Sequence, residues 1–260
     1  MKKRISCKID KIEEVARDVK HFTFKHHLKA KPGQFIMLTD YENGEKPFSI
    51  SDCYENKFSI TVKKVGPFTS HLFDLSVNDY LAFRGAYGSS FFMSKNKVLV
   101  IGGGCAVPPL YFLCKSLIQN KGEITLINGA RNHKDVIFKN RFNDLPIKHY
   151  IMTDDGSAGE KGTSVDKTEQ LLASENFDYI YAAGPEMMLK NLQSKLGKNQ
   201  YQFLLERYMK CAIGICGQCT LDDLGIRVCV EGPVFAEETI NRLTEFGHYH
   251  RDASGKRIKF

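Results

Sequence analysis

Four cysteines near the end of the chain have the type and spacing that an iron–sulfur cluster requires. They follow the pattern C-x4-C-x2-C-x9-C and are Cys211, Cys216, Cys219 and Cys229. In plant-type [2Fe–2S] sites, three thiolates come from one tight loop of this spacing and a fourth comes from a later segment. Gly214 and Gly217 lie in the loop, where a turn around inorganic sulfide needs positive φ angles and close backbone approach. The pattern therefore predicts a cluster and electron transfer.

Zinc or a disulfide pair are the alternatives for these four residues. Structural zinc sites usually combine two short C-x2–4-C knuckles, whereas Cys229 stands alone. The other cysteines are scattered in largely apolar segments, which suits reduced core thiols in a reducing compartment, and they are Cys7, Cys53, Cys105 and Cys114. We therefore favour the cluster and expect a cytoplasmic protein.

Two glycine turns indicate a phosphate-binding edge. Gly102, Gly103 and Gly104 come directly after an apolar strand and before a helix, where free N–H groups and the positive helix end can hold phosphate. Gly184 and Pro185 follow the apolar run YIYAA at what should be the same edge of a sheet. Together the turns favour a dinucleotide, although they lack the G-x-G-x-x-G fingerprint and a tight strand-to-helix turn is the other interpretation.

Two polar segments have both a functional and a structural interpretation. Lys46-Pro47-Phe48-Ser49 combines a cation, a fixed turn and a hydroxyl that suit a ring-plus-phosphate cofactor, but such turns are also common at barrel rims. Asp154 and Asp155 follow the run YIMT and could cap a helix or contact a ribose hydroxyl.

The first third of the chain predicts an antiparallel β-barrel. Short apolar or alternating runs recur about every ten residues between 6 and 92 and are separated by turn residues such as Pro32-Gly33 and Gly66-Pro67. Leu72 and Leu75 would share one face of a short helix over residues 69–75, inside this barrel domain.

Beyond residue 95 the runs become longer and alternate with helical segments, which predicts a parallel sheet with helices between its strands. From residue 201 the helical periodicity fades, the cysteine loop begins, and one helix is expected around 237–246. The predicted fold class is thus α+β and multidomain: a β-barrel over 1–94, an α/β dinucleotide domain over 95–200 and a small cluster subdomain over 201–260.

Composition excludes several other classes. The chain has 260 residues and 42% hydrophobic residues, enough for a sizeable core. Its net charge of +7 is spread along the chain, so we expect no nucleic-acid partner. No apolar run approaches the roughly 20 residues of a membrane span, and the first residues lack the apolar region of a signal peptide.

Taken in order, these segments resemble the ferredoxin reductase-like flavoproteins, and among them most closely the electron-transfer subunits of dihydroorotate dehydrogenase B. The likeness covers nearly the whole chain. It is carried by PGQFIML, KPFSIS, TVKKVGPFT and RGAYGSSF in the barrel, by TDDGSAGEKGTSVD at 153–166, and by ERYMKCAIGICGQCTLDDLGIRVCVEGPVF at 206–235.

The resemblance implies cofactors and the residues that hold them. FAD would be lined by Lys46, Pro47, Phe48, Ser49, Thr61, Val62, Lys63, Phe68 and Thr69, and the four loop cysteines would ligate a [2Fe–2S] cluster. NAD(H) would be a diffusible co-substrate at the glycine turns. Three departures bear on this: Lys46 stands where the family usually has arginine, Ala106 and Pro108 alter the G-G-G-x-G-x-A-P turn, and Ala183 replaces a cysteine.

By the same resemblance, the chain would pass electrons from an FMN-containing catalytic partner through the cluster and FAD to NAD+ in pyrimidine biosynthesis. The assembly would be a heterotetramer with two copies of each subunit, and this chain would have no dihydroorotate site of its own. Two alternatives remain open: the flavin subunit of a ferredoxin:NADP or sulfide-type oxidoreductase, and a redox-sensing protein whose nucleotide site does not function.

Overall fold

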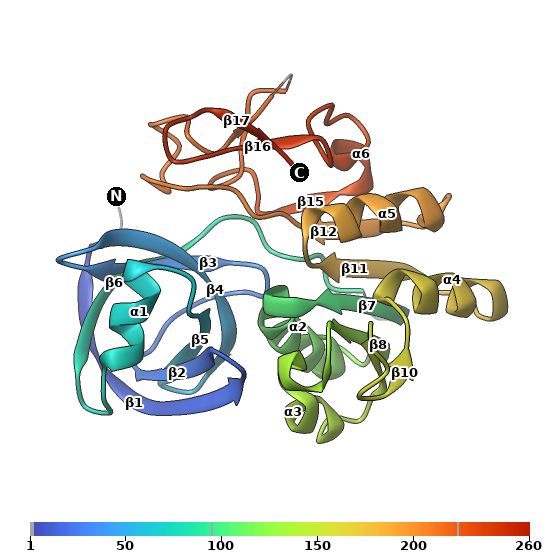
Figure 1. Ribbon diagram of the computed structural model, residues 1–260, viewed down its shortest axis with the longest axis horizontal. Helices are drawn as coiled ribbons and strands as arrows, with labels where there is room; N and C mark the ends of the chain where they lie inside the picture. The colour runs from blue at the N-terminus through green and yellow to red at the C-terminus, as the bar shows by residue number, and fades with distance from the viewer. Residues whose placement is uncertain (1–2, 95, 223) are drawn as a thin grey trace.

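A closed barrel, a seven-stranded sheet and a C-terminal lobe position the candidate residues (Figure 1). The C-terminal lobe comprises residues 205–233 and 237–260. The computed structural model describes residues 3–94, 96–222 and 224–260. The barrel lies at the lower left of Figure 1, the large sheet lies to its right, and the C-terminal segments lie above both.

The apolar and alternating runs predicted between residues 6 and 92 form the six strands of the barrel. Their order around the barrel is β1-β2-β5-β4-β3-β6, and each pair is antiparallel. The strands are β1 (Ile5–Ala16), β2 (Val19–Lys25), β3 (Phe35–Asp40), β4 (Gly44–Tyr54), β5 (Lys57–Lys63) and β6 (Tyr80–Tyr87). Closure removes the sheet edges, and aromatic side chains such as Phe22, Phe58 and Phe83 fill the interior.

The short helix inside the barrel domain, α1 (Pro67–Asp74), starts two residues earlier than predicted. Proline fixes φ at the first helical position, and the Thr69 hydroxyl accepts hydrogen bonds from the N–H groups of Val65 (2.8 Å) and Gly66 (3.0 Å). Leu72 is buried as expected, whereas Leu75 lies beyond the last turn in extended backbone and is only partly buried.

The large sheet has the order β10-β9-β8-β7-β11-β12-β15, and only β15 runs antiparallel to its neighbour. Its strands are β7 (Lys97–Gly103), β8 (Glu123–Ala130), β9 (Lys148–Thr153), β10 (Glu160–Lys161), β11 (Tyr179–Ala183), β12 (Tyr201–Leu204) and β15 (Val234–Ala236). The helices are α2 (Pro108–Gln119), α3 (Lys139–Asn143), α4 (Ser164–Ser174) and α5 (Glu186–Leu196).

Helices cover both faces of this sheet (Figure 1). Val98 and Val100 of β7 pack with the apolar residues of α2 and α3, whereas Leu99 and Ile101 pack with those of α4 and α5. This arrangement explains why the run KVLVI is continuously apolar, because both of its faces are buried.

The sheet continues beyond residue 200. β12 pairs with β11, and β15 returns after the cysteine loop to pair with β12, with Leu204 opposite Val234. The N–H of Leu205 also donates to the carbonyl of Pro233 (2.9 Å). Residues 205–233 therefore leave the sheet and return to it, and the paired strands β12 and β15 hold the two ends of this segment side by side.

The last segments form two small hairpins and a short helix. They are β13 (Thr220–Leu221) with β14 (Ile226–Arg227), α6 (Glu237–Ile240), and β16 (Tyr249–Arg251) with β17 (Arg257–Lys259). The helix expected over 237–246 is confined to its first four residues, after which the chain turns. Among the helices of the described ranges, none is long and apolar enough to cross a membrane.

Candidate cofactor cavity and cysteine loop

Two adjoining cavities lie where the barrel, the large sheet and the C-terminal lobe meet. The inner cavity, about 340 Å³, is enclosed by the barrel, the start of α2 and the segment after β12. The outer cavity, about 1190 Å³, is enclosed by the barrel rim, the start of α5 and the β16–β17 hairpin. Pro47, Phe48, Thr69 and the segment 205–207 line both, so the two cavities form one continuous site.

Eight of the nine residues expected to line FAD do line this site. Ser49, Thr61 and Lys63 line the inner cavity, Lys46 and Phe68 line the outer one, and Pro47, Phe48 and Thr69 line both. Val62 differs, because its side chain is fully buried in the barrel core and only its main chain could face a cofactor.

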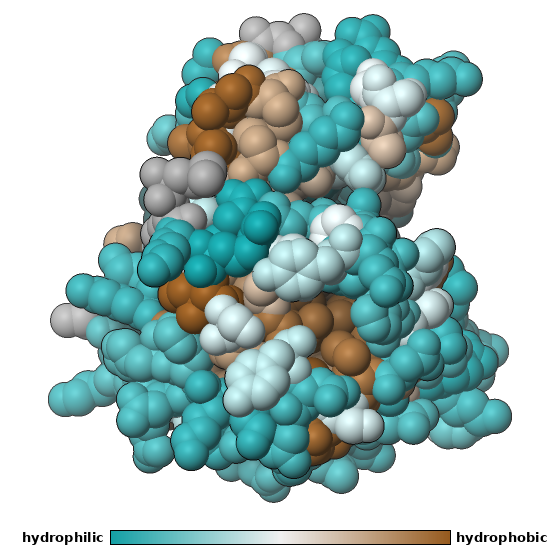
Figure 2. All heavy atoms as spheres, turned by 90° about the vertical axis from the view of Figure 1, so that its left-hand side faces the viewer, coloured by the Kyte–Doolittle hydropathy of each residue, from teal (hydrophilic) through white to brown (hydrophobic). Residues whose placement is uncertain are grey.

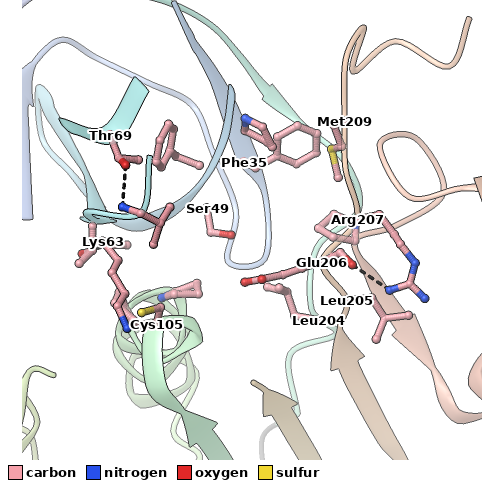
Figure 3. A pocket seen from close by; sticks show the side chains of 18 residues that line it. Phe35, Ser49, Lys63, Thr69, Cys105, Leu204, Leu205, Glu206, Arg207 and Met209 are labelled. Atoms are coloured by element: carbon pink, nitrogen blue, oxygen red, sulfur yellow. Dashed lines mark hydrogen bonds between the residues drawn. The ribbon is translucent and has the colours of Figure 1, made fainter. Parts of the chain in front are cut away.

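The inner cavity combines an apolar wall with hydroxyl and carboxyl groups. Figure 3 shows Ser49 and Glu206 extending into the same space from opposite walls. Behind them, the Thr61 hydroxyl is 3.0 Å from that of Ser51 and 2.9 Å from Nδ1 of His21. Burial, with the nearby positive charges of Arg141 and Lys11, lowers the pKa of His21 to about 3, so its imidazole is neutral. Such walls suit a flat ring with a polar edge.

The outer cavity is positively charged at the barrel rim. Nζ of Lys46 is 3.1 Å from the Tyr208 hydroxyl in this cavity, whereas Lys63 lines the inner cavity. Within the part of the chain that the structure describes, neither lysine has a carboxylate at ion-pair distance. The first turn of α1 also borders this cavity through Gly66 and Pro67. Unpaired cations and a helix N-terminus favour a phosphate group here.

The two glycine turns lie side by side at the carboxyl edge of the sheet. Gly102 pairs with Ala183, and a Cβ built on Gly184 would lie 3.5 Å from Cα of Gly103. Gly184 and Pro185 line the outer cavity, whereas Gly102, Gly103 and Gly104 do not form part of either wall. Gly103 is packed under α5, since a Cβ there would come within 2.5 Å of the Met188 sulfur.

The unusual residues near these turns are accommodated locally. Ala106 ends the short 3₁₀ turn η1 (Gly104–Ala106), and its φ is not positive, so alanine is tolerated there. Ala183 is fully buried in β11 and does not reach the cavities. Neither alanine lies in a cavity wall.

Asp154 and Asp155 do not cap the following helix. The carboxylate of Asp155 accepts hydrogen bonds from the N–H (2.9 Å) and hydroxyl (2.6 Å) of Ser157 and closes its own loop. Helix α4 is instead capped by Thr163 and Asp166, whose side chains and main-chain N–H groups bond reciprocally.

Several residues of the site were not predicted from sequence. Cys105 was expected in a core, yet it is exposed and lines the inner cavity, because it follows the end of β7 at the carboxyl edge. The segment 204–209 and the β16–β17 hairpin also contribute walls. The position of Cys105 directly after the three glycines could have predicted this, because ligands of open α/β sheets bind at the carboxyl ends of the strands.

The four loop cysteines form two pairs. The N–H of Cys216 points at Sγ of Cys211, and the N–H of Cys229 points at Sγ of Cys219, each at 3.4 Å. Gly214 and Gly217 have φ of 77° and 67°, as a turn around sulfide requires. Across residues 3–94, 96–222 and 224–260, no three His, Cys, Asp or Glu side chains are placed to hold one metal ion. Two thiol pairs suit a binuclear cluster, in which each iron takes two cysteines, better than a single zinc ion.

The loop favours the thiolate form of Cys211 and Cys219. Partial burial of Cys211 acts to raise its pKa, but main-chain N–H groups of Cys216 and Ile213 outweigh it and lower the pKa to about 6. A hydrogen bond from Cys229 lowers the pKa of Cys219 to about 7, while the pKa of Cys229 is raised as the donor. Thiolates are the form that binds metal.

Comparisons with known proteins agree with this architecture. Family models match residues 6–92 (oxidoreductase FAD-binding domain), 100–194 (oxidoreductase NAD-binding domain) and 206–241 (iron–sulfur cluster binding domain of dihydroorotate dehydrogenase B). Fold and site together define an iron–sulfur flavoprotein oxidoreductase of the ferredoxin reductase type. The predicted fold class is confirmed.

Full-length relatives identify the family. The chain is 40% identical over 264 residues, covering all of both proteins, to the probable dihydroorotate dehydrogenase B (NAD(+)) electron transfer subunit of Methanocaldococcus jannaschii. It is 43% identical, over 94% of both, to the protein of the same name from Pyrococcus abyssi. The chain belongs to the family of dihydroorotate dehydrogenase B electron transfer subunits.

A solved structure has the same layout. The structure of an NADH-dependent reduced ferredoxin-NADP oxidoreductase, studied for flavin-based electron bifurcation, superimposes with a TM-score of 0.82 at 29% identity. The match covers 92% of this chain and 93% of that one. A match of this extent reaches beyond the barrel and the large sheet into the C-terminal lobe.

Proposed function

We propose that this chain is the electron-transfer subunit of a dihydroorotate dehydrogenase B in pyrimidine biosynthesis, carrying electrons from an FMN-containing catalytic subunit to NAD+. The main observation in favour of this proposal is that the segment after β12 lines the cofactor cavities and then continues directly into the cysteine loop. Glu206, Arg207 and Met209 line the cofactor cavities, and Cys211 of the cysteine loop follows two residues later. One short stretch of chain thus joins the two candidate redox sites.

Each part of the chain has a separate task in this proposal. Lys46 and the first turn of α1 compensate the phosphates of FAD in the outer cavity, and Lys63 lines the inner cavity beside the flavin ring. Phe48 and Phe68, whose ring centroids are 5.9 Å apart, offer an apolar wall. Cys211, Cys216, Cys219 and Cys229 hold a [2Fe–2S] cluster. When bound, the flavin supplies the exchange between hydride and single-electron chemistry, and the cluster supplies one-electron transfer. The glycine turns at Gly102–Gly104 and Gly184–Pro185 seat NAD(H).

We propose the domain limits 1–94, 95–200 and 201–260 for these tasks and a cytoplasmic heterotetramer with two copies of each subunit. The oxidation of dihydroorotate belongs to the partner. The cysteine loop must then lie near the partner, and exposed apolar side chains next to the cysteines support this. Ile215 is 80% exposed and Val230 is 42% exposed. Figure 2 shows hydrophobic surface on the upper part of the molecule, which the C-terminal segments form.

Replacing Ile215 by aspartate should weaken the complex with an FMN-containing partner, because a charge would be placed in an apolar contact beside the cluster. Affinity for the purified partner, measured by calorimetry, is expected to fall at least about tenfold. Val77→Asp is the matched control, since Val77 is 47% exposed on the barrel domain. Equal affinities for the two variants would remove Ile215 from the interface.

The proposed function is tested by anaerobic titration of the purified protein with NADH, following flavin and cluster absorbance together. Stoichiometric bleaching of both chromophores is expected, as is their reduction by dihydroorotate once the FMN-containing partner is added. Reduction by dithionite but not by NADH would contradict nicotinamide binding at the glycine turns. It would favour a redox-sensing protein instead.

The second candidate is the flavin subunit of a ferredoxin:NADP or sulfide-type oxidoreductase. The similarity to the solved NADH-dependent ferredoxin-NADP oxidoreductase favours it. Reduction of both chromophores by a large glutamate-synthase-like partner, and none by dihydroorotate with an FMN-containing partner, would establish this alternative.

A further inference from the structure

The β16–β17 hairpin forms one wall of the outer cavity, opposite the barrel. His250, Arg251, Asp252, Ala253 and Phe260 line the cavity from this side, and Asn43, Lys46 and Phe68 line it from the barrel. The hairpin lies above the barrel in Figure 1. It also lies outside the residues matched by the cluster-binding family model, which end at 241.

The hairpin presents an aromatic pair to the cavity. The rings of His250 and Phe260 have centroids 4.9 Å apart and an interplanar angle of 38°. Phe260 is 51% exposed, so much of its ring is free to contact a ligand. A planar aromatic ligand in the cavity would stack on the exposed ring of Phe260.

The position of this wall is set by the protein itself. The carboxylate of Asp222 accepts hydrogen bonds from the Tyr249 hydroxyl (2.5 Å) and from the guanidinium groups of Arg251 (2.8 Å) and Arg257 (2.9 Å). The side-chain amide of Gln218, between two of the loop cysteines, donates to the carbonyl of Asp252 (2.7 Å). The hairpin is therefore held against the cysteine loop before any ligand binds.

We propose that the hairpin binds the adenosine end of FAD, with the adenine ring stacked on the His250–Phe260 pair. The inference rests on the proposed seating of FAD, with its flavin ring in the inner cavity. The phosphate-binding groups, Lys46 and the first turn of α1, then lie on the barrel side of the outer cavity. The adenosine lies beyond the phosphates in FAD, and the hairpin is the wall that faces them across this cavity.

The test compares FAD with FMN, which lacks the adenylate half. The full-length chain is stripped of flavin and titrated with each, following flavin fluorescence. In the double variant His250→Ala with Phe260→Ala, FAD affinity is expected to fall about tenfold or more while FMN affinity stays unchanged. Lys259→Ala, also on the hairpin but outside the cavity walls, should change neither affinity.

Three outcomes would overturn the inference: an equal loss of FAD and FMN affinity, unchanged FAD affinity, or a loss confined to NADH, which also carries adenosine diphosphate. If the wild-type chain binds neither flavin, the proposed function fails rather than the hairpin assignment. Should the double variant not fold, as judged by circular dichroism, Phe260→Leu keeps the apolar bulk and removes only the ring. It should lower FAD affinity several-fold and spare FMN.

Discussion

Replacement of Cys219 by serine is expected to abolish the cluster absorbance and leave the flavin absorbance in place. Serine is a poor ligand because its hydroxyl stays protonated at neutral pH, whereas Cys219 has a pKa lowered to about 7. Cys219 is buried beside Cys229 and lines neither cofactor cavity. The barrel residues that would seat FAD are therefore untouched by the change.

Absorbance spectra together with iron and flavin content measure this effect. Cys53→Ser is the control, because Cys53 lies outside the loop and its thiol donates to the carbonyl of Leu28, a bond that serine can also make. Retention of the full cluster spectrum in Cys219→Ser would contradict the ligand assignment. Loss of flavin as well would show that the FAD site depends on the cysteine loop.

Replacement of Arg207 by methionine is expected to lower the free energy of unfolding by about 3–5 kcal/mol. The Arg207 side chain is only 4% exposed and lies between two buried carboxylates. It donates to Glu186 and, at 2.9 and 3.1 Å, to Glu245. Without the guanidinium, two buried charges would face each other, and among the described residues their remaining donors are the main-chain N–H groups of Gly247 and Asp222.

Chemical denaturation of the variant and the wild type measures the difference. Arg17→Met is the matched control, because Arg17 pairs with Asp135 at the surface, where its side chain is 56% exposed. Its loss should cost no more than about 1 kcal/mol. A deficit equal to that of the control would show that the buried pairs contribute little.

Local patterns in the sequence determined the barrel and the chemistry of the cysteine loop. Each of the six barrel strands coincides with a short apolar or alternating run between turn residues. These strands were therefore predictable without knowing which strand pairs with which. The loop spacing is local in the same sense, because three of its cysteines lie within nine residues. The carboxyl-edge position of both glycine turns likewise follows from their place after apolar strands.

Only the tertiary structure decided which distant segments meet. β12 and β15 have four and three residues, too few for a recognisable period, and they are strands because the sheet supplies their partners. Arg207, Glu186 and Glu245 come from three separate segments. The hairpin lines the outer cavity where hydrogen bonds with Asp222 and Gln218 hold it. Periodicity reports burial along one element, whereas the walls of this cofactor site come from contacts between elements, which no local pattern encodes.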